Sequence, residues 1–228
     1  MGNFAFDKEL AKRLLAEFTG TALVLTLGCC YAKSGGGYDT HSTQSSFAWG
    51  LAYLTAIHIF AMLSGAHLNP AVSGTATIVG IMEWQLMLWY MLAQLLGAMA
   101  GIALTYAVLQ TSKSLCLSGM DDKVNVLSIE LLATFFLLLA YCAAWDTRSE
   151  GAYETLSLRI GFIFTGLSFA TYPTTGCHLN FFRTFAAAAV NGSWGIIWPY
   201  LVAHAAAAAA AGCIWRFLFA EEAPEPMA

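Results

Sequence analysis

The chain has 228 residues, of which 58% are hydrophobic and 11% are charged. A soluble domain carries about one quarter charged residues, so this chain has too little polar surface to cover a globule. The formal net charge of -4 does not decide topology, because membrane orientation follows the Lys and Arg residues near the ends of spans. The composition excludes an ordinary soluble domain and predicts a membrane protein.

Apolar stretches of about 20 residues, the length needed to cross a bilayer, recur along the sequence. We expect six spans, over residues 9–31, 44–63, 82–109, 125–145, 157–173 and 195–219. No A-x-A-like cleavage site follows a short apolar core near the start, so the first span is expected to remain. The prediction is a single all-α membrane domain over residues 1–228, in which residues 220–228 form a solvated tail.

The basic residues favour an orientation with both termini in the cytoplasm. In that orientation six basic residues lie inside and three lie outside, which agrees with the positive-inside rule. The inner set is Lys8, Lys12, Arg13, Arg148, Arg159 and Arg216, and the outer set is Lys33, Lys113 and Lys123. The host membrane, plasma or intracellular, is left open.

The sequence repeats itself in two halves, over residues 9–109 and 125–219. Glu17 begins a Glu-x-x-x-Thr pattern that returns at Glu130, and the segment Ser64-Gly-Ala-His-Leu-Asn69 returns as Thr175-Gly-Cys-His-Leu-Asn180. Each Glu precedes its Asn by a similar distance, 52 and 50 residues. Because each half holds three spans, the halves must enter the membrane in opposite orientations, as in inverted-repeat transport proteins.

Each repeated Asn is followed by an apolar segment of about half a span, residues 71–79 and 182–190. Such segments are expected to be re-entrant half-helices, because they are too short to cross the bilayer. Non-helical backbone at membrane depth is tolerated only where it is buried in protein or lines a wet cavity. Two interruptions in matching places therefore indicate an aqueous path.

The motif Ser64-Gly-Ala-His-Leu-Asn69-Pro70-Ala71-Val72 resembles the first signature of the aquaporin, or major intrinsic protein, family, and the resemblance runs from Glu17 to Phe219. It implies an aquaporin-like fold of six transmembrane helices and two half-helices, with a pore in each subunit of a homotetramer. It also implies a passive channel for water and small uncharged solutes. We expect no enzyme activity, cofactor, metal site or nucleic-acid partner.

The resemblance gives Asn69 and Asn180 a pore role, in which their amides donate hydrogen bonds to the permeating solute. The alternative is simple capping, since Asn is a favoured N-cap and Pro70 suits the first helical position. The positive dipole ends of two half-helices meeting at mid-membrane, about half an elementary charge each, would repel cations. They would also reorient water and so interrupt proton hopping.

Arg183 is a lone cation in an apolar segment, and fixed offsets from the two Asn residues align it with a filter of Trp49, Ser168, Cys177 and Arg183. Water-selective members of the family usually carry His at the Ser168 position and Phe at the Trp49 position, which favours a wider filter here. Glycerol-passing members usually carry a bulky aromatic residue at the Cys177 position and Asp where this chain has Thr184. Water alone and water with small polyols both stay open.

The second signature departs from the family pattern, because Phe181 and Phe182 stand where Pro and Ala are expected. The loss of Pro removes a preorganised helix start. The two rings must either be absorbed between helices or narrow the pore, and overpacking commonly costs about 1 to 3 kcal/mol. The alternative function is therefore a poorly conducting or gated protein of the same fold with a structural or junctional role.

Glu17 and Glu130 are intramembrane carboxyl groups, for which we favour a scaffold role, accepting hydrogen bonds from the re-entrant loops, over a proton relay. His67 and His178, two residues before each Asn, are expected to brace the loops or to line the pore. His58 and His204 are expected to form core hydrogen bonds.

The six cysteines lack a CxxC spacing, so neither a disulfide framework nor a zinc site is expected. Cys29, Cys30, Cys142 and Cys213 are interpreted as small buried side chains. Cys177 would face the external vestibule, either as a target for thiol-modifying metals such as mercury or as an inert residue that sets the pore width. Asn191 begins a glycosylation sequon on the outer side, and its use is left open.

Overall fold

The computed structural model describes residues 7–31, 38–110, 116–117, 122–149, 154–195 and 197–220. Within these residues the chain forms eight α-helices and one π-helical turn, and no strand. In chain order the elements are α1 Lys8–Tyr31, α2 Tyr38–Ser64, α3 Pro70–Val79, α4 Trp84–Leu109, α5 Lys123–Trp145, α6 Leu156–Thr175, α7 Phe181–Asn191, α8 Ile197–Ile214 and η1 Trp215–Phe219.

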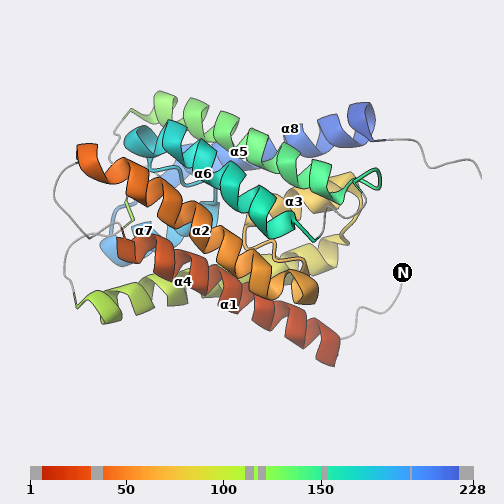
Figure 1. Cartoon of the computed structure of the whole chain (residues 1–228), viewed down its shortest axis with the longest axis horizontal. Helices are drawn as coiled ribbons and strands as arrows, with labels where there is room; N and C mark the ends of the chain where they lie inside the picture. Colours follow the sequence, from red (N-terminus) through yellow and green to blue (C-terminus); the bar gives the residue numbers. More distant parts are fainter. Residues whose placement is uncertain are drawn as a thin grey trace, which may run out of the picture.

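The six long helices lie roughly along one axis, and the two short helices enter from opposite ends (Figure 1). Five of the long helices are long and apolar enough to cross a membrane: α1, α2, α4, α5 and α8 with η1. The sixth, α6, has 20 residues and is rich in Ser, Thr and Gly. It packs along α2. The expected six spans therefore appear as helices, and the all-α membrane fold is confirmed.

The two halves use equivalent elements in the same order, which confirms the repeat. The third span of each half contacts the half-helix of the other, α4 with α7 and α8 with α3. The basic residues expected inside lie at or next to four helix ends: the start of α1, the end of α5, the start of α6 and the turn η1 after α8. These ends lie together at one end of the bundle (Figure 1). Lys33, Lys113 and most of the tail fall outside the described residues.

Small residues let the helix backbones approach closely, as expected for membrane helices that pack without a hydrophobic driving force. A Cβ atom at Gly97 of α4 would overlap the Phe18 carbonyl of α1, and one at Gly101 would lie 2.6 Å from the Ala22 carbonyl oxygen. Gly97 and Gly101 therefore form a face of α4 that packs directly on the backbone of α1. His58, in contrast, is exposed on α2, so the expectation that it hydrogen-bonds in the core is wrong.

We expect Gly97→Ala to destabilise the protein, because the added methyl group must push α1 and α4 apart. The cost should be about 1 to 3 kcal/mol, as for other overpacked cores. Thermal unfolding of purified protein in detergent measures the change. Gly166→Ala on α6 is the matched control, since nothing lies within 4 Å of its added Cβ. An equal unfolding midpoint for both variants would contradict the packing role.

Cys29 and Cys116 form a disulfide, so the expectation of no disulfide and the interpretation of Cys29 as an inert buried thiol are both wrong. The bond joins the end of α1 to the segment between α4 and α5, which connects the two halves. Spacing did not predict it, because the two cysteines are 87 residues apart and meet only when the bundle has formed. Cys30, Cys142, Cys177 and Cys213 are free, and Cys213 is exposed rather than buried.

Cys29→Ser should lower the stability of the folded protein by about 2 to 4 kcal/mol, the usual range for a disulfide that closes a long loop. Treatment with a reductant should lower the unfolding midpoint of the unaltered protein to a similar extent. Cys30→Ser is the control, because the Cys30 thiol is free. If the reductant and Cys29→Ser both left the midpoint unchanged, the two cysteines would not be bonded in the membrane protein.

Candidate functional site

The first re-entrant loop is built around the Glu17 carboxylate of α1, which is fully buried. Its Oε1 atom accepts hydrogen bonds from the Ser64 hydroxyl at 2.7 Å and from the His67 backbone N–H at 2.9 Å. Its Oε2 atom accepts from the Leu68 N–H at 2.7 Å and from the Gln94 amide at 2.8 Å. Four donors therefore satisfy one carboxylate and fix the loop against α1 and α4.

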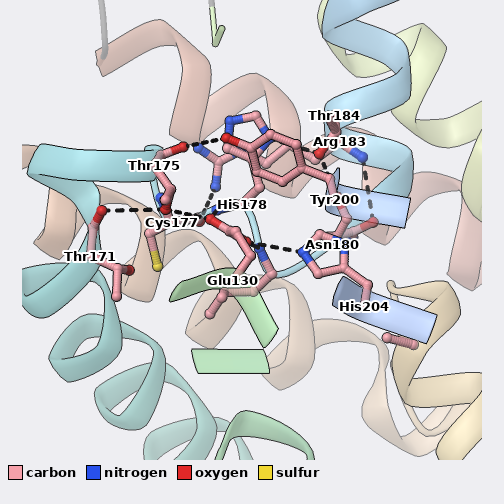
Figure 2. A network of polar contacts seen from close by, with 12 residues as sticks. Glu130, Thr171, Thr175, Cys177, His178, Asn180, Arg183, Thr184, Tyr200 and His204 are labelled. Atoms are coloured by element: carbon pink, nitrogen blue, oxygen red, sulfur yellow. Dashed lines mark hydrogen bonds and ion pairs between the residues drawn. The ribbon is translucent and has the colours of Figure 1, made fainter. Parts of the chain in front are cut away.

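The second loop repeats this arrangement around Glu130 of α5 (Figure 2). The carboxylate accepts hydrogen bonds from the Thr175 hydroxyl at 2.5 Å, the His178 N–H at 2.9 Å and the Leu179 N–H at 2.8 Å. Nε2 of His204 on α8 lies 3.0 Å from the carboxylate and takes the place that Gln94 holds in the first half. The predicted scaffold geometry of both carboxylates is present, and His204 hydrogen-bonds in the core as expected.

Each loop adopts a strained backbone so that its N–H groups reach the carboxylate. Ala66 and Leu68 have φ values of 48° and 55°, and Cys177 and Leu179 have φ values of 49° and 51°. Residues other than glycine seldom occupy this left-handed region, and each costs roughly 1 to 3 kcal/mol. The charge-assisted hydrogen bonds to the buried carboxylates offset that strain.

Each repeated histidine ties its loop to the first turn of the half-helix that follows. His67 Nδ1 lies 3.1 Å from the Ser73 hydroxyl, and His178 Nδ1 lies 2.8 Å from the Thr184 hydroxyl. Both imidazole rings also pack edge-on or tilted against a tyrosine, Tyr90 in the first half and Tyr200 in the second. These contacts are those of a loop brace, and the described residues contain no cluster of three or more metal-ligating side chains.

Glu130→Ala should loosen the second loop selectively, because the His178 and Leu179 N–H groups would lose their acceptor. An unsatisfied buried donor costs about 1 to 3 kcal/mol. Hydrogen–deuterium exchange in detergent micelles should show faster exchange over residues 175–180 and unchanged exchange over residues 64–69. Glu9→Ala is the control, since Glu9 forms an exposed ion pair with Lys12. Unchanged exchange in Glu130→Ala would contradict the scaffold role.

The two repeated asparagines meet at the start of the half-helices, and both side chains are fully buried. Asn69 Oδ1 caps α3 by accepting from the Ala71 N–H at 2.9 Å, and Asn180 Oδ1 caps α7 by accepting from the Phe182 N–H at 2.9 Å. The amide nitrogens cross between the halves. Asn69 Nδ2 donates to the Leu179 carbonyl at 2.7 Å, and Asn180 Nδ2 donates to the Leu68 carbonyl at 2.9 Å. Capping therefore uses the oxygen and leaves the nitrogen for contacts at the centre.

Three of the four residues predicted to form the filter are in direct contact. The Arg183 guanidinium donates to the Cys177 carbonyl at 2.6 Å and to the Gly176 carbonyl at 2.7 Å, and its Cζ atom lies 3.5 Å from the centroid of the Trp49 ring. The Cys177 thiol lies next to the Ser168 side chain of α6. All four side chains are buried, and Arg183 is only 2% exposed.

The Trp49 ring is held from behind by α1. A Cβ atom at Gly28 would overlap the ring, so only glycine permits this packing. Trp49 thus contacts both the Gly28 backbone and the Arg183 guanidinium. Among the described residues, no hydrogen-bond partner reaches Trp49 Nε1 or Arg183 Nε. Two donors of the predicted filter are therefore buried and unpaired among the described residues.

Phe181 and Phe182 lie on the side of the half-helices that faces α4 and α8. They line an apolar cavity of about 410 Å³, together with Pro70, Ala71 and residues of α3, α4 and α8. Trp49, Ser168, Cys177 and Arg183 do not line this cavity. Small side chains on α8, including Ala205, Ala208 and Ala209, leave room for the rings. The rings were expected either to be absorbed between helices or to narrow the pore, and their position in this cavity matches the first outcome.

A model of the family described as Major intrinsic protein matches residues 5–215 of this chain. The chain belongs to the major intrinsic protein family. It is similar to the human lens fiber major intrinsic protein, with 32% identity over 197 residues that cover 84% of this chain and 74% of the human protein. Aquaporin-4 of Mus musculus is 28% identical over 218 residues, covering 91% of this chain and 67% of that protein.

The fold of this major intrinsic protein also matches a solved relative. The X-ray structure of the aquaglyceroporin from Plasmodium falciparum superposes with a TM-score of 0.81, covering 92% of this chain and 96% of that one. The identity between the two sequences is 23%. The comparison therefore shows a shared fold, whereas the range of solutes depends on the residues of this chain.

Two residues of this family member were not found from the sequence: Gln94, which completes the Glu17 site, and Tyr53, which lies 3.4 Å from the Asn180 amide nitrogen. His204 was expected to hydrogen-bond in the core, but its partner, Glu130, was not predicted. A signal for Tyr53 existed, because it follows Trp49 by four residues and therefore lies on the same face of a helix. Gln94 and His204 differ in type, so comparison of the halves did not reveal them.

Proposed function

We propose that this chain forms a passive transmembrane channel for water. The observation that supports this proposal most directly is that the two half-helices start at the centre of the bundle. There the Asn69 and Asn180 amides each donate a hydrogen bond to the loop of the other half. The positive dipole ends of the half-helices oppose cations at that point, and Arg183 adds a full positive charge at the filter. In this proposal Asn69 and Asn180 orient the permeating water, and Trp49, Ser168, Cys177 and Arg183 select it.

The proposed solute range includes water and leaves glycerol as the next candidate. The structural relative named as an aquaglyceroporin supports testing glycerol, and Ser168 leaves more space than a histidine would. The Trp49 ring supports the same test, since it gives an apolar wall for the carbon face of a polyol. The close contact of that ring with Arg183 argues against a wide filter. Water permeation is therefore proposed as the main activity.

We further propose that the whole chain is one channel domain with both termini in the cytoplasm, assembled as a homotetramer. The disulfide between Cys29 and Cys116 supports this orientation, because disulfides persist on the oxidising side of a membrane. Cys29 lies at the end of α1 that is opposite to Lys8 and Lys12. The tetramer rests on family membership alone.

Proteoliposomes that contain the protein should shrink faster than empty vesicles after an osmotic step, as followed by stopped-flow light scattering. The Arg183→Leu variant should still fold, and the set of solutes that its filter admits should change, because the filter loses its positive charge. Separate steps with glycerol and urea establish the solute range. Shrinkage equal to that of empty vesicles, with folded protein present, would contradict the channel and favour a structural or junctional role.

Phe181→Pro with Phe182→Ala should leave water permeability nearly unchanged, because both rings line the cavity between α4 and α8 instead of the filter. The same stopped-flow assay, normalised to the amount of reconstituted protein, checks this expectation. A large rise in permeability would show that the rings close the path and that the protein is a poorly conducting member of its fold.

A further inference from the structure

Tyr53 lies on α2 one helical turn from Trp49 and nearer to the centre of the bundle. Its side chain is 2% exposed. The ring stacks on Phe164 of α6, with centroids 4.3 Å apart and planes inclined by 24°. Stacking of this kind contributes about 0.5 to 1.5 kcal/mol beyond burial. The phenol is therefore held in one position at the level of the asparagine pair.

The Tyr53 hydroxyl makes the two pore amides unequal. An Asn amide nitrogen carries two hydrogens. Asn180 Nδ2 donates one to the Leu68 carbonyl at 2.9 Å and the other to the Tyr53 hydroxyl oxygen at 3.4 Å. Asn69 Nδ2 donates to the Leu179 carbonyl at 2.7 Å, and it makes no second hydrogen bond in the described part of the chain. Asn69 thus keeps a hydrogen for a solute, whereas both hydrogens of Asn180 are engaged.

The contact between Tyr53 and Asn180 is replaceable. A donor–acceptor distance of 3.4 Å exceeds the 2.7 to 3.2 Å of an ordinary N–H···O bond, so this bond is weak. A water that entered between the two groups could accept from Asn180 and receive the phenol hydrogen. It would have to push the hydroxyl away from the amide, because the Asn180 side chain is fully buried.

We infer that Tyr53 forms a second constriction, at the asparagine pair, which limits the rate of permeation and favours water over larger solutes. This inference rests on the proposed channel function. The hydroxyl occupies the position from which a solute would accept the Asn180 hydrogen bond. A water molecule displaces only the hydroxyl, whereas a polyol must also displace the ring and break its stacking on Phe164. Tyr53 therefore acts on permeation in series with Trp49 and Arg183.

The test measures water and glycerol permeability per reconstituted protein for Tyr53→Phe and Tyr53→Leu. Tyr53→Phe removes the hydroxyl and should raise water permeability about threefold, as expected when one weak hydrogen bond no longer has to be displaced. Tyr53→Leu also removes the ring and should raise the ratio of glycerol to water permeability. Tyr106→Phe is the matched control, because the Tyr106 hydroxyl bonds to Asn191, at the other end of α7. It should match the unaltered protein.

Because two constrictions in series can mask each other, the same measurements are made with Trp49→Ala alone and combined with Tyr53→Leu. A further rise in the double variant supports the inference. Equal permeability of Tyr53→Phe, Tyr53→Leu and the unaltered protein, with no gain in the double variant, overturns it while leaving the channel function intact. If every variant matches empty vesicles although circular dichroism shows it folded, the proposed channel function itself fails.

Discussion

A buried carboxylate in each half of the molecule accepts hydrogen bonds from a loop that has no regular secondary structure, and the remaining architecture depends on these two sites. At membrane depth an unpaired N–H group costs free energy, and so does an unpaired charge. Glu17 and Glu130 resolve both costs together, since each carboxylate is satisfied by the loop N–H groups that would otherwise be unpaired. The left-handed residues of the loops persist because these bonds hold them.

The carboxylate sites place the asparagines, and the asparagines join the halves. Once each loop is fixed, the half-helix that follows must start at the centre of the bundle, with its dipole directed at its counterpart. The crossed bonds from Asn69 to Leu179 and from Asn180 to Leu68 then link loops that are more than 100 residues apart. Capping and solute contact are not alternatives, because they use different atoms of the same amide.

Much of this could be predicted from the sequence, because the repeat carries it. Glu17 and Glu130, the paired histidines and the two asparagines recur at matched spacing, and a repeated polar residue inside an apolar segment has few explanations. Other features had no such signal. The fourth carboxylate partner is Gln94 in one half and His204 in the other, so identity between the halves could not reveal it.

The direction of the Phe181 and Phe182 rings depended on tertiary packing that no local pattern encodes. Their accommodation requires the small side chains of α8, which the sequence shows only as an alanine run. The Cys29–Cys116 disulfide likewise became visible only when two distant segments met. The pore roles of Trp49, Ser168 and Cys177 came from family offsets, and the contacts of Arg183 with Trp49 and Cys177 agree with those offsets.

The most direct test of the account is the temperature dependence of water flux, measured with proton flux on the same vesicles. If two helix starts and the asparagine amides meet around a continuous hydrated path, water should cross with an activation energy close to that of diffusion in bulk water, while proton flux stays at the level of empty vesicles. A high activation energy typical of lipid, or a proton flux that rises with water flux, would contradict the account.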